Sequence, residues 1–321
     1  MPEITAATVK ELREKTGLPM MDCKQALTEA NGDQDKAIEL LRKKGKKVQE
    51  KQSGRSTSTG RIAVYAEPDS KFAAIIDIRC ETAPVANNEH FMALANDLAK
   101  QLATGPGAAT PDALLDQPSP NGKGTLREQF DDLNNRIREK FVLERIMRVD
   151  APAAGYVHHN GAVGTLLQFE GAHGGELARD VAMHVTALNP GYLKREQVDS
   201  ALVEKERTLL SEALALEADK IKSEAEAVLA KPDQQIQDPN NLERMTSSHG
   251  RARGDIKKVE GMAKNREKVI EGRMGVFFAE RCLLEQPHAN QAKYASKSIA
   301  DLAKSAGMNI KAFIRWELPK E

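Results

Sequence analysis

Residues 8–45, TVKELREKTGLPMMDCKQALTEANGDQDKAIELLRKKG, contain three short helical patterns that decide how the N-terminal part of this chain folds. The patterns are separated by Gly17-Leu18-Pro19 and by Asn31-Gly32, residue types that end helices and form turns. Between the first two helices, Leu18-Pro19-Met20-Met21 is apolar where a loop is usually polar, and exposed apolar segments often bind another protein. We therefore expect a three-helix module over residues 1–46 that binds a partner.

The helix ends of this module follow from local sequence. Thr8 and Glu11 have the spacing of a capping box, so the first helix is expected to start near Thr5 or Thr8. The second helix is expected over 21–30 and the third from 33 to about 45, where a glycine follows a basic stretch. The basic residues of that stretch suit a helix C-terminus, because cations there offset the helix dipole.

Composition and charge exclude several classes of protein. The 321 residues include 47 basic and 47 acidic side chains, and this balance argues against nucleic acid as the main partner. Cys23, Cys80 and Cys282 lie far apart and form no CxxC pair, so neither a disulfide framework nor a zinc site is expected. The sequence shows no signal peptide, transit peptide or apolar run long enough to span a membrane, which predicts a cytoplasmic protein.

After a polar linker over 47–60, the pattern changes from helical to alternating. Residues 61–67 and 71–80 predict a β-hairpin, 88–103 a helix, and 144–149 a third strand. Between this helix and the third strand, a loop is expected over 104–124 and a charged helix over 125–143.

The same order recurs in the second half of the chain. Strands are expected over 155–159, 162–170 and 311–318, with a helix over 175–188. An insertion over about 200–272 carries two narrow apolar stripes, which favour an antiparallel coiled coil. The predicted fold is therefore α+β, with a helical module, core halves over 61–151 and 152–321, and a helical insertion in the second half.

The sequence contains no recognisable catalytic centre. It has neither of the glycine-rich phosphate-binding motifs GxxxxGK[ST] and GxGxxG, and neither HExxH nor GxSxG. His158 and His159 are expected in a strand with their rings on opposite faces, which is poor geometry for a shared metal ion. The prediction is a protein that is not an enzyme and has no cofactor or metal site.

Several short motifs follow one another along the chain in a fixed order. They are Val9-Lys10-Glu11-Leu12-Arg13, Lys15-Thr16-Gly17, Met20-Met21-Asp22-Cys23-Lys24, Asn31-Gly32-Asp33, Cys80-Glu81-Thr82, Val85-Ala86, Ala182-Met183-His184-Val185, Glu271-Gly272-Arg273-Met274 and Phe313-Ile314-Arg315. This ordered set resembles the elongation factor Ts family. The resemblance is good over 3–45, 60–103, 144–192 and 268–318, and it is poor over 104–143 and 225–265.

The resemblance implies a fold and a function. The family is known as the nucleotide exchange factor for elongation factor Tu, the GTPase that delivers aminoacyl-tRNA to the ribosome. Its fold is a ubiquitin-associated-like helical module, two related α+β core halves and a coiled-coil arm. The chain is thus expected to bind elongation factor Tu with its bound GDP and to promote GDP release, without binding the nucleotide itself. A homodimer through the core or the coiled-coil arm is a further possibility.

The resemblance also implies partner-binding residues in three segments. In the family, the first docks the nucleotide-binding domain of the GTPase, the second pushes at its magnesium and phosphate region, and a histidine in the third presses on a neighbouring helix. These residues are Met20, Met21, Asp22, Cys23 and Lys24; Glu81, Thr82, Ala83, Pro84, Val85 and Ala86; and Met183 and His184.

The second segment departs from the family pattern. The family typically has Asp-Phe between the threonine and the valine, with the aromatic ring as a wedge, whereas this chain has Ala83-Pro84. We expect Pro84 to act as a rigid, blunt probe and His184 to supply more of the distortion. The departure keeps a rival hypothesis open, an adaptor or ribosome-linked binding module that has lost exchange activity.

Structural roles remain open for several of these residues. Met20 and Met21 could fill the core of the helical module, because methionine adapts to irregular packing. Cys23 is expected to be a small buried residue rather than a reactive thiol. His184 could be a hydrogen-bonded core histidine instead of an interface residue.

Overall fold

The computed structural model describes residues 4–67, 70–122, 124–171, 175–230 and 239–319, with the backbone alone for residues 46 and 239–246. The fold is α+β and contains two three-stranded antiparallel sheets. The chain divides into two compact units, one of residues 1–189, 288–290 and 301–321 and the other of residues 190–287 and 291–300. Both sheets belong to the first unit, and the second unit is helical.

Three helices form the N-terminal module, as the sequence predicts. Thr5 caps the first helix by accepting from the backbone N–H of Thr8, so the predicted capping box of Thr8 and Glu11 is wrong. Gly17 ends this helix with a φ of 67°, a conformation that glycine adopts without strain. The apolar faces pack around Leu12 and Leu27, which are fully buried. The helices are α1 (Ala6–Thr16), α2 (Met20–Glu29) and α3 (Gln34–Gln52).

The third helix is longer than predicted. The sequence analysis ended it near Gly45 and placed a linker over 47–60, but α3 continues to Gln52. The added turns consist mainly of lysine, glutamine and glutamate, which are good helix formers. Gly45 also has a packing role, because a Cβ atom there would lie 2.2 Å from Asn135 Nδ2. The helical module is therefore joined to the core by a helix, and only the residues between Gln52 and β1 form an irregular connection.

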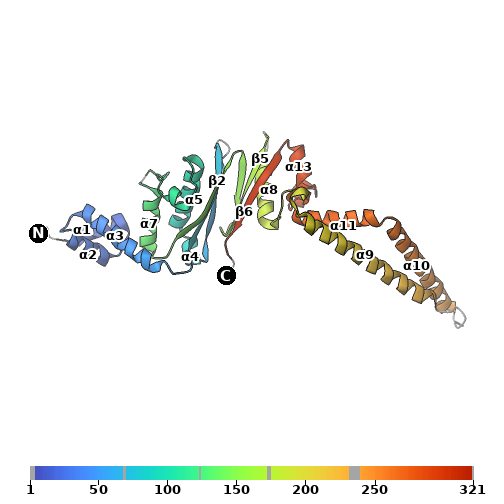
Figure 1. Cartoon of the computed structure of the whole chain (residues 1–321). Coiled ribbons are helices and arrows are strands. Elements are labelled where there is room, and N and C mark those ends of the chain that lie inside the picture. Colours follow the sequence, from blue (N-terminus) through green and yellow to red (C-terminus); the bar gives the residue numbers. More distant parts are fainter. Residues whose placement is uncertain (1–3, 68–69, 123, 172–174, 231–238, 320–321) are drawn as a thin grey trace. The chain divides into compact units, whose positions relative to one another are not determined.

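The first sheet has the strand order β1-β2-β3 and is covered on one face by α5 (Figure 1). Its core contains Ile76, Phe91 and Leu98, all fully buried. The predicted hairpin, helix and third strand are all present, and the predicted loop over 104–124 includes one short helix. The elements are β1 (Thr59–Tyr65), β2 (Phe72–Cys80), α4 (Ala83–Ala86), α5 (Glu89–Thr104), α6 (Pro111–Leu115), α7 (Leu126–Ile137) and β3 (Val142–Asp150).

The second sheet has the order β4-β5-β6, and α8 packs on it (Figure 1). The other face meets the first sheet, with Ile62, Ile75 and Leu166 buried between them. Two strand glycines permit this close approach, because a Cβ at Gly155 would lie 2.3 Å from Val64 Cγ1 and one at Gly164 would lie 2.5 Å from Ile62 Cγ2. The elements are β4 (Ala153–Val157), β5 (Val163–Glu170), α8 (Gly175–Leu188) and β6 (Asn309–Glu317).

One prediction about this sheet is wrong. The strand β4 ends at Val157, so His158 and His159 lie in the turn that follows it. Their ring centroids are 4.2 Å apart, which replaces the predicted placement on opposite faces of a strand.

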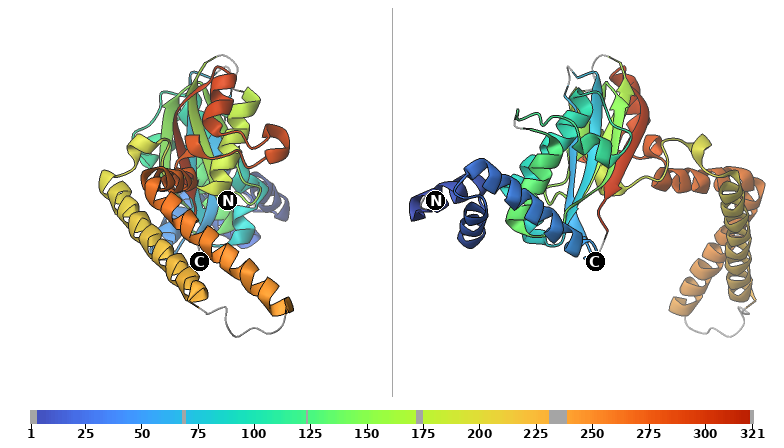
Figure 2. Two further views of the ribbon diagram at one scale, coloured as in Figure 1. Left: turned by 90° about the vertical axis from the view of Figure 1, so that its right-hand side faces the viewer. Right: turned by 60° about the vertical axis from the view of Figure 1, so that its left-hand side comes forward.

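The second unit is built on three long helices. Both α10 and α11 pack against α9 (Figure 2). Leu214, Met274 and Phe277 are buried among them, and Arg207 pairs with Glu267 and Glu271. The second apolar stripe was predicted as one helix, but it is divided at Asn265 between α10 and α11. The helices are α9 (Ser200–Leu229), α10 (Pro239–Lys264) and α11 (Arg266–Arg281).

Short elements complete the chain: η1 (Arg195–Gln197), η3 (Leu283–Glu285), α12 (Gln291–Tyr294) and α13 (Ile299–Ser305). Within the described ranges, no helix has the length and apolar character needed to cross a bilayer. Residues 231–238, which lie between the two helices of the predicted coiled coil, are outside the described residues.

Candidate partner-binding site

The first predicted segment, residues 20–24, forms the start of α2, which begins at Met20, one residue earlier than predicted. The inner face of this helix is occupied by Cys23, Ala26 and Leu27, which are buried, so the preceding methionines point outward. Met20 is 44% exposed and Met21 is 72% exposed. The alternative that both methionines fill the core of the module is therefore wrong, and the two thioethers form an exposed apolar surface.

The other members of this segment differ in their surroundings. Lys24 is exposed, and the buried Cys23 thiol lies 3.7 Å from the carbonyl oxygen of Leu18. Asp22 pairs with Lys44 of α3 at 3.3 Å and with Arg138, which follows α7. The Asp22 carboxylate therefore ties the helical module to the core.

The second predicted segment, residues 81–86, is a helical turn rather than an open loop. Thr82 occupies the N-cap position of α4, and Pro84 lies in its first turn, where a missing N–H leaves no hydrogen bond unmade. Ala83 and Pro84 are exposed, whereas Ala86 is buried against the first sheet's core. The turn therefore projects a small, rigid apolar tip.

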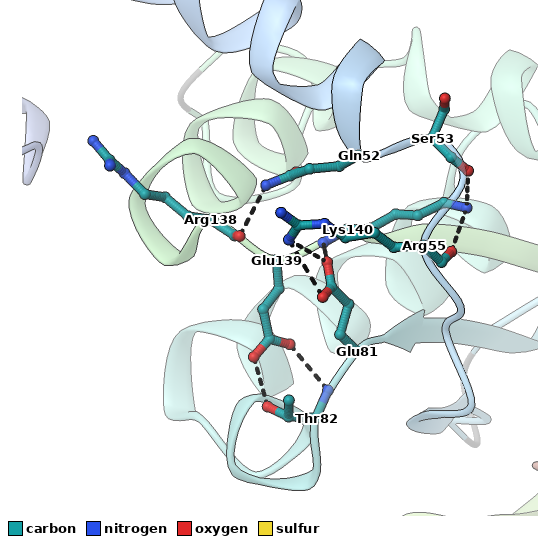
Figure 3. A network of polar contacts seen from close by, with 8 residues as sticks. All are labelled: Gln52, Ser53, Arg55, Glu81, Thr82, Arg138, Glu139 and Lys140. Carbon is teal, nitrogen blue, oxygen red and sulfur yellow. Dashed lines mark hydrogen bonds and ion pairs between the residues drawn. The ribbon is translucent and has the colours of Figure 1, made fainter.

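A polar network fixes the start of this turn (Figure 3). Glu139 accepts from the backbone N–H of Thr82 at 3.0 Å and from the Thr82 hydroxyl at 2.6 Å. Glu81 accepts from the backbone N–H of Lys140 at 2.6 Å and from the Arg55 guanidinium at 3.2 Å. Because Glu81 is largely shielded from solvent, its ion pair is screened less than an exposed one.

The cysteine beside this turn has no chemical role that the geometry supports. Burial raises the pKa of the Cys80 thiol, which keeps the group protonated near neutral pH. Its Sγ–H donates to the carbonyl oxygen of Thr82 at 3.3 Å, which adds to the anchoring of the turn.

The third predicted pair, Met183 and His184, is split between surface and core. His184 is buried, and its Nδ1 accepts from the backbone N–H of Ala289 at 3.0 Å. Met183 is 43% exposed, and the exposed Leu188 lies farther along the same helix. The structure thus places His184 as a hydrogen-bonded core histidine, and Met183 is the member of the pair that reaches the surface.

The described residues offer no metal centre, since they contain no group of three histidine, cysteine, aspartate or glutamate side chains arranged to hold an ion. The structure instead presents two exposed apolar tips, Met20-Met21 at the start of α2 and Ala83-Pro84 at the start of α4, and polar contacts hold both segments to the core. Such an arrangement is suited to binding another protein.

Comparison with known proteins identifies the family. Residues 81–320 match the family model described as Elongation factor TS. The curated protein "Elongation factor Ts" of Clostridium botulinum (strain Alaska E43 / Type E3) is 33% identical over an alignment of 324 positions, which covers 98% of this chain and 92% of that protein. The chain belongs to the elongation factor Ts family. The family model begins at Glu81, and the helical module is covered by the alignment with the curated relative.

Three residues of the polar network are absent from the sequence predictions for this elongation factor Ts family member. Arg55 lies in the segment predicted as a linker, and Glu139 and Lys140 lie in 104–143, where the motif resemblance was poor. No local pattern marks them, because the contacts join residues 26 to 87 positions apart in the sequence.

Proposed function

We propose that this elongation factor Ts family member binds elongation factor Tu with its bound GDP and accelerates GDP release. The observation that carries the proposal is the pairing of two exposed apolar tips on one frame, Met20-Met21 on α2 and Ala83-Pro84 on α4. Neither tip has a catalytic group beside it, which fits a protein that acts by binding. The family membership supplies the partner and the process, translation elongation.

Nucleotide exchange of this kind is a coupling of two binding equilibria. The exchange factor and GDP each weaken the other's hold on the GTPase, by the same free energy. An acceleration of 10,000-fold requires about 5.5 kcal/mol of differential binding. That free energy must come from contacts that the GTPase makes only in its nucleotide-free shape.

The two tips would make different contributions. Met20 and Met21 bury apolar area against the partner in either state, so they supply affinity without favouring release. The α4 turn would contact the magnesium and phosphate region of the partner, where occupation by protein competes with the bound ion. Ala83 and Pro84 bring neither a carboxylate nor an aromatic ring, so the turn would act through its shape alone. Met183 would add a surface contact from α8, and His184 would support that helix from within.

Stopped-flow release of a fluorescent GDP analogue from elongation factor Tu tests the proposal. At saturation, addition of the chain should increase the release rate toward the 10,000-fold that about 5.5 kcal/mol of coupling free energy allows. A second candidate, an adaptor without exchange activity, is favoured by the Ala83-Pro84 departure and predicts binding with an unchanged release rate.

The same proposal includes a cytoplasmic location, where translation takes place.

Self-association is a separate question, for which α9 offers a surface: Leu202, Leu209 and Leu216 recur every seven residues and are exposed. A heptad stripe of this kind suits a second helix. Sedimentation of wild type and of Leu209→Glu would reveal whether a homodimer forms through it.

A further inference from the structure

Two of the three residues that follow α7, Arg138 and Lys140, hold the end of α3. The carbonyl oxygen of Arg138 accepts from Gln52 Nε2 at 2.9 Å. The Lys140 ammonium donates to the carbonyl oxygens of Ser53 at 2.6 Å and Arg55 at 2.9 Å. These contacts fix the point where the helical module joins the core (Figure 3).

Glu139 and Lys140 also hold the start of α4, from the other side. Glu139 binds Thr82 through both of its carboxylate oxygens, and the Lys140 N–H donates to Glu81. Arg55 closes the ring, because its guanidinium donates to both oxygens of Glu81, at 3.2 and 3.4 Å. Residues 138–140 therefore lie between the end of α3 and the turn that carries Ala83 and Pro84.

Residues 138–140 are themselves well anchored. Arg138 ends α7 in the left-handed conformation, with a φ of 64°, and its N–H donates to the carbonyl oxygen of Asn134 at 2.7 Å. Phe141, the next residue, is buried in the core of the first sheet, and β3 begins at Val142. A segment held at both ends can transmit position from one neighbour to the other.

We propose that Glu139 and Lys140 are positioning residues for nucleotide exchange, which fix the α4 turn relative to α3 so that both contact surfaces reach the partner as one body. This proposal rests on the proposed function. It assigns a role to side chains at the base of the turn, and it explains why the network holds Glu81 and Thr82 rather than the exposed Ala83 and Pro84.

The composition of the tip makes its placement important. A long aromatic side chain can adjust its rotamer to reach its target, but Ala83 and Pro84 have no such freedom. A blunt tip therefore acts only where the backbone puts it, and an ordered site loses less free energy on binding than a mobile one. Hydrogen bonds to an ionised carboxylate, such as those from Thr82 to Glu139, are stronger than neutral ones.

GDP release from elongation factor Tu, measured against the concentration of the chain, tests the positioning role. Glu139→Ala and Lys140→Met should each lower the maximal release rate at least fivefold, while the half-saturating concentration stays within twofold of wild type. Lys140→Arg, which keeps the charge and the donors, should restore most of the rate. Glu170→Gln is the matched control, because it breaks the surface ion pair with Lys311 far from the turn and should leave the rate unchanged.

Two outcomes would overturn the proposal. One is a maximal rate equal to wild type in both variants, and the other is a loss confined to the half-saturating concentration, which would indicate a docking role. Thermal unfolding of each variant distinguishes a positioning role from a folding defect. A positioning role predicts that the variants are still folded at the temperature of the exchange assay and nevertheless show the lower maximal rate.

Hydrogen exchange tests the geometry without the partner. Glu139→Ala, which removes the contacts with Thr82, should increase amide exchange across 82–88. Lys140→Met keeps the backbone N–H that donates to Glu81 but loses the ammonium contacts with Ser53 and Arg55, so it should increase exchange across 50–55. Protection in β5 should stay the same in both variants. If the wild-type chain fails to accelerate GDP release from elongation factor Tu, the proposed function is wrong. If amide protection across 82–88 is unchanged in Glu139→Ala, the positioning role is wrong whatever the kinetics show.

Discussion

Truncation of the two exposed methionines should weaken partner binding without affecting the fold. Full burial of a methionine side chain is worth about 1.5–3 kcal/mol. Scaled by the exposed fractions of 44% for Met20 and 72% for Met21, burial of both against a partner is worth roughly 1.7–3.5 kcal/mol. The double variant Met20→Ala/Met21→Ala should therefore raise the Kd for elongation factor Tu about 15- to 300-fold, since 1.4 kcal/mol is tenfold.

The assay is titration calorimetry with nucleotide-free elongation factor Tu. Met147→Ala is the matched control, because Met147 in β3 is 42% exposed and belongs to neither proposed contact surface. The control should bind as wild type, and the double variant should stay folded because neither methionine belongs to the buried core of the helical module. A Kd within threefold of wild type in the double variant would refute the reasoning, and so would an equal loss in Met147→Ala.

Three further predictions concern the framework. Asp77 is fully buried between Arg79 and Arg145, so Asp77→Ala should lower the free energy of unfolding by about 3–5 kcal/mol, measured by urea denaturation, whereas loss of the exposed Glu144 should cost under about 1 kcal/mol. Gly45→Ala should lower the free energy of unfolding, because the added Cβ clashes with Asn135. In the double variant with Asn135→Ala the clash is removed, and helix propensity should leave a gain of about 1 kcal/mol. If the effects of the two single variants on the free energy of unfolding simply add, the packing role of Gly45 is wrong. Burial raises the pKa of the Cys80 thiol. The thiol therefore stabilises the fold fully below its unfolded-state pKa, and this stabilisation is lost as pH rises through its folded-state pKa. Cys80→Ala should flatten the decline in the free energy of unfolding above about pH 9, and an unchanged slope would contradict this.

Local patterns were sufficient for most of the secondary structure. Among the described residues, each strand overlaps the segment predicted for it, although β4 ends at Val157 and not at residue 159, and α8 has the predicted bounds, Gly175–Leu188. Such patterns work because a strand or helix must turn one apolar face toward a core, and this requirement is written in the spacing of the residues. The ordered motifs likewise carried the family, which the comparisons confirmed.

Helix ends and side-chain exposure followed less well from the sequence. Gly45 is a helix-ending residue by propensity, yet α3 passes through it because α7 packs against the space that a side chain would fill. Residues 82–86 carry a proline and two alanines, and nothing local distinguishes a loop from the single helical turn they form. His184 follows the exposed Met183, and only the packing of residues 288–290 against α8 decides that its ring is buried.

The sequence by itself determined the module, the two sheets, the family and the residue types at the proposed contact surfaces. The tertiary structure alone decided how those surfaces are held. Arg55, Glu139 and Lys140 are unremarkable charged residues in the sequence. They form a network with Glu81 and Thr82 because the end of α3, the start of α4 and the end of α7 meet at one place. A hydrogen bond forms only when the donor and acceptor atoms lie within a few tenths of an ångström of about 2.9 Å. Here those atoms belong to residues that are distant in the chain, and the periodicity of a single segment does not encode the distance between them.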